Sequence, residues 1–178
     1  MSEERKSPSI LPMIGISAAI FFAIVFLIMA MNTGDILWFW PVFDETPQRI
    51  VVHCYGTKIT LEPGTPDFEA VNDAVNSTLT GRNRWDELSM SNATYVEYQT
   101  SPSVVVLELP YDPPVGMHSM YKFFKNFDLL VIPLDGRHAS INTVFGRMNG
   151  QMIPGSMHPE SNAEIVDALS EQDVCHIR

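Results

Sequence analysis

The sequence predicts an α+β protein in which one N-terminal transmembrane helix precedes a single extracytoplasmic domain with a mostly antiparallel sheet and two or three helices. Three observations predict this fold class. Segment 10–31 carries no charge, several later segments have the short apolar or alternating pattern of strands, and two segments have helical spacing. The chain therefore divides into a cytoplasmic tail 1–9, a transmembrane helix 10–31, an interfacial aromatic linker 32–46 and a domain 47–178.

The uncharged segment contains 22 residues. An α-helix rises about 1.5 Å per residue, so this length crosses a hydrocarbon layer about 30 Å thick. The apolar core of a cleaved signal peptide is shorter, roughly 7–15 residues, which favours a retained anchor. Gly15, Ala18 and Ala19 form a small-residue face of the kind that lets membrane helices approach closely. The ordinary composition of membrane helices also accounts for that face.

The residues on either side of this segment predict its orientation. Arg5 and Lys6 precede it, and the next basic residue is Arg49. The positive-inside rule predicts a cytoplasmic N-terminus and an extracytoplasmic domain at the cell membrane.

Aromatic residues follow the segment closely. Such residues anchor in the lipid headgroup layer, which makes membrane lipid an expected partner. Contact with another protein is the alternative for the same cluster, which consists of Trp38, Phe39, Trp40 and Phe43.

The charge of the chain falls on the predicted external part. The four charges before the segment cancel, so the whole formal charge of −10 lies after it. An acidic surface repels nucleic acid phosphates and anionic lipid, which argues against both as partners.

The two cysteines, Cys54 and Cys175, lie on the side where disulfides persist. A bridge between them would close a loop of more than 100 residues, worth about 4–5 kcal/mol in the chain-entropy model. Two free thiols are the alternative, because sequence does not give the Cα separation.

The first half of the domain begins with two strands, 49–55 and 57–61, separated at Gly56. A helix over 66–79 follows, with Thr65 as its N-cap and proline in its first turn.

Residues 81–90 are polar and predict a loop. Strands are then predicted over 92–99 and 103–109, the second ending at Pro110. Apolar residues between 117 and 127 fit a helical stripe moderately well.

The second half predicts a strand over 128–134, a two-residue hairpin turn at Asp135-Gly136 and a returning strand over 139–145. Another turn is expected at Asn149-Gly150. A helix over 162–171 completes the domain, with a capping box formed by Ser161 and Glu164.

No sequence motif predicts a catalytic site or an organic cofactor. The best metal candidate is a segment of soft ligands, Met117, His118 and Met120, which suit Cu(I). Methionine also fills irregular cores, which is the alternative for the same residues.

These observations predict a non-enzymatic, single-pass membrane-anchored protein. Its expected role is an accessory or structural subunit of a larger membrane protein complex, with other membrane proteins as partners. A copper-handling protein and a membrane-tethered sensor or regulator are the alternatives.

Overall fold

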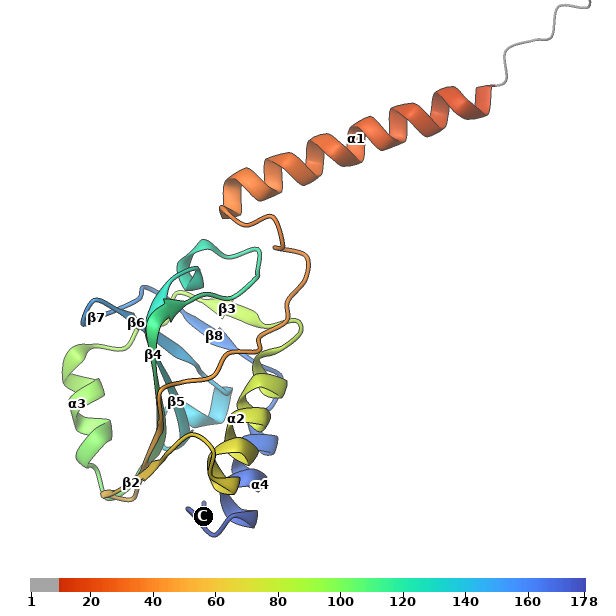
Figure 1. Ribbon diagram of the computed structural model, residues 1–178. Coiled ribbons are helices and arrows are strands. Elements are labelled where there is room, and N and C mark those ends of the chain that lie inside the picture. The colour runs from red at the N-terminus through yellow and green to blue at the C-terminus, as the bar shows by residue number, and fades with distance from the viewer. Residues whose placement is uncertain (1–9) are drawn as a thin grey trace, which may run out of the picture.

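The computed structural model describes residues 10–178, apart from the side chain of Lys122. The predicted tail 1–9, with Arg5 and Lys6, lies outside the described residues. Helix α1 (Ile10–Thr33) projects away from a folded domain, as Figure 1 shows. By length and composition this helix is apolar enough to cross a membrane, and its most apolar window is not buried in the domain.

The domain contains two antiparallel sheets and three longer helices, so the predicted α+β class is confirmed. The larger sheet has the order β2-β1-β4-β5-β6-β7, and every neighbouring pair in it is antiparallel. Its strands are β1 (Ile50–Cys54), β2 (Thr57–Leu61), β4 (Val105–Val115), β5 (Phe127–Asp135), β6 (Phe145–Met148) and β7 (Gln151–Met152). The smaller sheet pairs β3 (Arg84–Asp86) with β8 (Ser156–His158). The helices are α2 (Pro66–Leu79), α3 (Asn92–Thr100) and α4 (Ala163–Glu171), with 3₁₀ turns η1 (Lys122–Phe124) and η2 (Ala139–Ile141).

Both faces of the larger sheet are covered. Figure 1 shows α2 and α4 on one face and α3 on the other. Alternate residues of the central strands point to opposite faces. Leu107 and Ile132 therefore join the core under α2 and α4, whereas Val106 and Val131 join the core under α3.

Several predicted elements form for the predicted reasons. The β1–β2 turn consists of Tyr55 and Gly56, both with positive φ, as a tight hairpin requires. Thr65 caps α2 by accepting a hydrogen bond from the N–H of Phe68 at 3.4 Å. Asn149 and Gly150 likewise form the tight β6–β7 turn.

The predicted strand 92–99 is wrong, because these residues form helix α3. The β-branched and aromatic residues of this segment misled the prediction. Ser91 accepts a hydrogen bond from the N–H of Thr94 and starts the helix. Tyr98 then packs on the sheet, with its hydroxyl 2.7 Å from Nδ1 of His138. Packing and capping outweigh the strand propensity of the segment.

The predicted hairpin at Asp135-Gly136 and the strand 139–145 are also wrong. The Asp135 carboxylate accepts hydrogen bonds from its neighbour Gly136 N–H and from the Tyr55 hydroxyl, each at 2.7 Å. The chain therefore leaves the sheet after β5, forms η2, and returns only at Phe145.

Four smaller differences remain. Strand β4 continues past Pro110 to Val115, with a register shift between these two residues. The predicted capping box is absent, because Ser161 accepts from the N–H of Ala163 and α4 begins after Asn162. Between 117 and 127 only η1 is helical, and strand β3 occupies part of the predicted loop 81–90.

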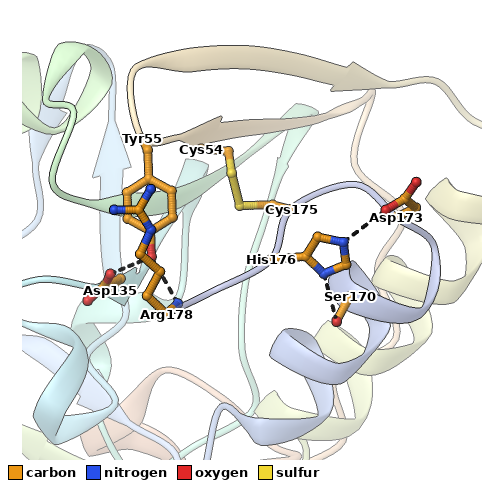
Figure 2. Close-up of a disulfide and its surroundings, with 8 residues drawn as sticks. All are labelled: Cys54, Tyr55, Asp135, Ser170, Asp173, Cys175, His176 and Arg178. Carbon is orange, nitrogen blue, oxygen red and sulfur yellow. Dashed lines mark hydrogen bonds and ion pairs between the residues drawn. A yellow bond between two sulfur atoms is a disulfide. The ribbon is translucent and has the colours of Figure 1, made fainter.

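A disulfide joins Cys54 at the end of β1 to Cys175 in the C-terminal tail, with the Cα atoms 6.0 Å apart (Figure 2). The Arg178 guanidinium stacks over the Tyr55 ring, with its central carbon 4.7 Å from the ring centre. The Arg178 backbone N–H also donates to the Tyr55 hydroxyl at 3.0 Å. The tail is therefore fastened to the β1–β2 hairpin, at the end of the domain far from α1.

Replacing both cysteines with serine should lower the midpoint of denaturant unfolding. The bridged positions are 121 residues apart, and closure of such a loop contributes about 4–5 kcal/mol in the chain-entropy model. Reduced wild-type protein should match the double variant, and the reductant should not affect the variant. Equal midpoints for oxidised and reduced wild-type protein would contradict this stabilising role.

Candidate functional site

The end of α1 directs the chain into the domain. Gly34 has a φ of +68° and follows the last helical residue, the position that glycine favours at a helix C-terminus. The N–H of Asp35 then donates to the carbonyl of Ala30 at 3.2 Å, which closes a Schellman motif. Thr33 adds a side-chain hydrogen bond to the carbonyl of Met29 at 2.9 Å. This cap fixes the position of Asp35 relative to the helix axis.

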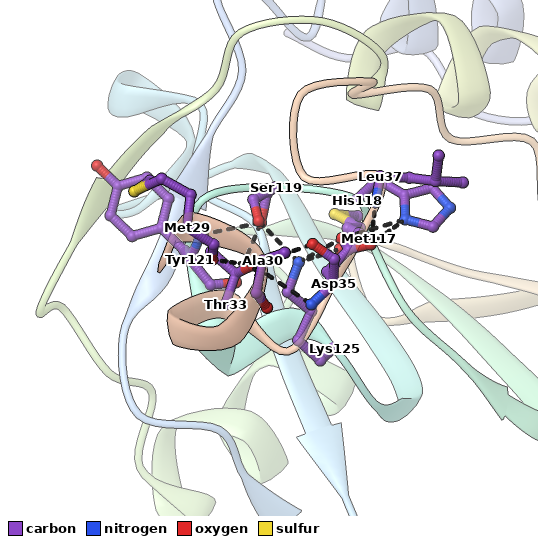
Figure 3. A network of polar contacts seen from close by, with 10 residues as sticks. All are labelled: Met29, Ala30, Thr33, Asp35, Leu37, Met117, His118, Ser119, Tyr121 and Lys125. Carbon is purple, nitrogen blue, oxygen red and sulfur yellow. Dashed lines mark hydrogen bonds and ion pairs between the residues drawn. The ribbon is translucent and has the colours of Figure 1, made fainter. Parts of the chain in front are cut away.

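Asp35 connects α1 to the loop between β4 and β5 (Figure 3). Its carboxylate accepts a hydrogen bond from Nζ of Lys125 at 2.8 Å and lies 3.1 Å from Nδ1 of His118. The Lys125 ammonium also donates to the carbonyls of Met117 and Ser119, at 3.1 and 2.7 Å. Its three donors are thereby all used. We call these contacts the Asp35 junction.

Two members of the Asp35 junction are largely shielded from solvent, with side-chain exposures of 9% for Asp35 and 21% for Lys125, whereas His118 is 41% exposed. Burial by itself raises the pKa of Asp35. Hydrogen bonds from Lys125, the Leu37 N–H and His118 outweigh that effect and hold the pKa of this carboxyl below its usual value. Asp35 is therefore a stable anion at neutral pH.

The linker after the junction is held along the C-terminal end of α2. The Thr80 hydroxyl accepts from the N–H of Phe43 at 3.0 Å and lies 3.2 Å from the Phe43 carbonyl. The N–H of Gly81 donates to the carbonyl of Pro41 at 2.7 Å. The Phe43 ring is buried against Tyr111 and contacts Phe127. Among the four aromatic residues predicted to lie at the membrane interface, Phe43 thus belongs to the domain core.

Exposed apolar side chains surround the junction. They come from the linker and from the β4–β5 loop, which are far apart in sequence but meet at the Asp35 junction. Trp40 is 60% exposed and Met120 is 54% exposed. We call this set the apolar collar: Ile36, Leu37, Phe39, Trp40, Met120, Tyr121 and Phe123.

A hollow of about 510 Å³ lies between the linker and the domain. Trp38 and Phe39 form part of its linker wall, and Trp85 and Tyr121 form part of the opposite wall. Trp85 and Tyr121 stack with their ring centres 4.7 Å apart. The indole N–H of Trp38 is buried and has no acceptor among the described residues. The volume lies in the range of small-molecule sites.

The structure brings the predicted copper candidates to this same hollow. Met117, His118 and Met120 line it, together with Met157. Because Nδ1 of His118 faces the Asp35 carboxylate, the carboxylate orients the imidazole, as carboxylates do for many metal-binding histidines. Among the described residues, no group of three or more histidine, cysteine, aspartate or glutamate side chains is arranged to hold a metal ion. A metal here would depend on the methionine sulfurs.

The small-residue face predicted on α1 remains exposed. Gly15, Ala18 and Ala19 are all accessible, and a Cβ placed on Gly15 would meet nothing within 4 Å. This face therefore contacts no part of the described domain.

Two buried polar groups lie elsewhere in the domain. Ser156 Oγ lies 3.0 Å from Nε2 of His158, whose Nδ1 lies 2.8 Å from the carbonyl of Ile141. This resembles a nucleophile and its base, but Ser156 is fully buried and no substrate reaches its hydroxyl.

The second group lies beneath α3. Glu108 accepts from the Gln99 amide at 2.7 Å and lies 3.4 Å from Nε2 of His53. Burial raises the pKa of Glu108, but its interactions with His53, Gln99 and Tyr95 outweigh burial and lower it. These contacts fasten α3 to the sheet.

Sequence reasoning did not select Asp35, Lys125, Trp85 or Tyr121 as site residues. One signal was present, since Asp35 is an isolated acid directly after a helix-ending glycine. The partner of that acid is 90 residues away in sequence, and no local pattern identifies it.

Comparison of the chain with protein-family models, curated proteins and solved structures finds no match. The functional argument therefore rests on the residues and geometry of this chain.

Asp35→Asn should lower the melting temperature of the full-length protein in detergent. The change keeps the size of the side chain but removes the charge, at a cost of about 1–3 kcal/mol for a charge-assisted hydrogen bond. The folded pKa of Asp35 lies below its usual 3.8, so its contribution is present above that pH and is lost as pH falls through the folded value.

The difference between Asp35→Asn and wild type should thus be measurable at pH 7 and shrink as pH falls below 3.8. Asp73→Asn is the matched control, because Asp73 is exposed on α2 and takes part in none of the ion pairs of the described residues. Equal melting temperatures for Asp35→Asn and wild type at pH 7 would contradict the importance of the junction.

Proposed function

We propose that this protein is a non-enzymatic, single-pass membrane-anchored protein that acts as an accessory or structural subunit of a larger membrane protein complex. The Asp35 junction carries this proposal. A domain that is only tethered needs no fixed contact with its linker, whereas here Asp35, two residues after α1, forms a partly buried ion pair with the domain. The junction presents the apolar collar and the hollow at the end of the domain nearest α1.

The orientation that we propose has the N-terminus in the cytoplasm and the domain on the extracytoplasmic side of the cell membrane. Arg5 and Lys6 before α1 support it through the positive-inside rule. The disulfide between Cys54 and Cys175 supports it as well, because disulfides persist in oxidising compartments.

Thiol labelling of intact cells tests this orientation. A cysteine at Ser170, which is exposed on α4, should react with a membrane-impermeant reagent, and one at Ser2 should react only after lysis. The wild-type chain is the control, since its two cysteines are bridged and should not be labelled. Labelling at Ser2 but not at Ser170 in intact cells would reverse the proposed orientation.

Protein partners are supported by the amount of apolar surface near the junction. Most of α1 is exposed, and the collar adds side chains from two segments. Contiguous apolar surface of this kind marks contact with a membrane or another protein. We propose that the bilayer covers part of it, and that neighbouring membrane proteins contact the small-residue face of α1 and the remaining collar.

Full-length protein extracted in mild detergent should comigrate with larger membrane proteins on a native gel. The double variant Trp40→Ser/Met120→Ser should reduce the comigrating fraction several-fold, because both side chains are exposed in the collar. Val96→Ser is the control, since Val96 is equally exposed but lies on α3. A wild-type protein that runs as a lone monomer would reject the accessory role.

Copper handling is the second candidate, favoured by the convergence of Met117, His118 and Met120 on one hollow. Thioether and imidazole ligands suit Cu(I). Full-length protein purified in mild detergent would then retain copper. His118→Asn would abolish retention, because asparagine keeps a donor near Asp35 but removes the imidazole ligand. Protein free of copper after growth with added copper would reject this candidate.

A further inference from the structure

A second hollow adjoins the first. It has a volume of about 400 Å³, and it shares Arg82 and Asn83 with the hollow beside the linker. Its other lining residues are Arg84, His158 and Glu160. We call the two hollows together the depression: the first is its aromatic part and the second is its basic part.

The charge of the basic part comes from Arg82 and Arg84. Both side chains are exposed, and neither forms an ion pair with an acid among the described residues. His158 adds no spare donor, because both of its ring nitrogens already have partners. Glu160 is the acid on the rim. In a chain of formal charge −10, two unpaired neighbouring arginines create a local site for an anion.

Phosphate is the anion that arginine recognises best, because the planar guanidinium donates two parallel hydrogen bonds to it. The aromatic part adds an apolar wall made by Trp38, Phe39 and Trp85. A ligand that fits both parts of the depression combines a phosphate with an apolar chain.

The position of the depression identifies the source of such a ligand. The linker wall begins at Trp38, five residues after α1 ends at Thr33, so the aromatic part lies near the end of the helix. If α1 crosses the membrane, as our proposed function requires, we infer that this part of the depression lies at the headgroup layer. We propose that the depression binds one anionic phospholipid, with its phosphate on Arg82 and Arg84 and its apolar part against Trp38 and Trp85.

The acidic surface of the domain confines the proposed lipid binding to the depression. Overall charge repels anionic lipid, so a general lipid cloud is not expected around the protein. Binding through the local arginine pair instead gives one tightly held lipid per chain.

Native mass spectrometry of the full-length protein in mild detergent tests the proposal. With added phosphatidylglycerol the protein should retain one lipid, and with phosphatidylcholine it should retain none. Arg82→Gln/Arg84→Gln should lower phosphatidylglycerol retention at least about tenfold, since each arginine donates charge-assisted hydrogen bonds. Lys58→Gln/Arg137→Gln makes the same change in charge at exposed residues outside both hollows and should leave retention unchanged.

Equal retention of the two lipids, or equal loss in the two double variants, would overturn the proposal. Displacement of phosphatidylglycerol by inorganic phosphate alone would show a site for a free anion and would overturn the lipid assignment. Trp38→Phe replaces the indole with a smaller ring and should weaken retention by a smaller factor; no effect would remove Trp38 from the site.

Comigration with larger membrane proteins on a native gel tests the accessory role separately in the same samples. A lone monomer that keeps one phosphatidylglycerol would reject the accessory role but not the lipid site. Comigration that depends on Arg82 and Arg84 without lipid retention would show that the arginines bind a partner protein, and the lipid site would be rejected.

Discussion

Burial of both faces of the β4–β5 pair is the constraint on which the rest of the domain depends. Strands that are apolar on both faces must be covered on both sides. Helices α2 and α4 cover one face, and α3 covers the other. The need for a second cover explains why the segment 92–100 is helical despite its strand-like composition. It also explains the polar contacts of Glu108 and Tyr98, which fasten that cover to the sheet.

Elements whose signals are local were predictable from the sequence. Helix α2 has its cap, first-turn proline and apolar stripe within 15 residues, and its predicted bounds agree with the structure. The segment after Asp135 was not predictable, because the side chain that decides its path bonds to Tyr55, 80 residues away. Similarly, no residue near Ser91 indicates that the segment after it covers a face of the sheet. Local chemistry determines turns and caps, whereas packing partners decide between helix and strand where propensities are weak.

The candidate site was likewise predictable only where its signals are local in the sequence. The apolar segment and the aromatic residues after it are visible in the sequence, and they mark the end of the chain where α1 meets the domain. The loop that completes this end was predicted only as a helical stripe. It takes a different shape because the Lys125 ammonium gathers the carbonyls of Met117 and Ser119. A side chain on Gly116 would collide with the Lys125 carbonyl, so the loop closes only around glycine.

The disulfide divides the molecule into a covalent ring and a tether. Residues 54–175 form the ring, which holds β3, β8 and the β4–β5 loop, and hence the outer wall of the depression. The linker wall, with Trp38 and Phe39, lies on the tether before Cys54. The two walls are therefore joined by hydrogen bonds, an ion pair and packing, while the ring itself resists expansion. Tension transmitted along α1 would act first on the tether, and would part the walls of the depression before it strained the sheet.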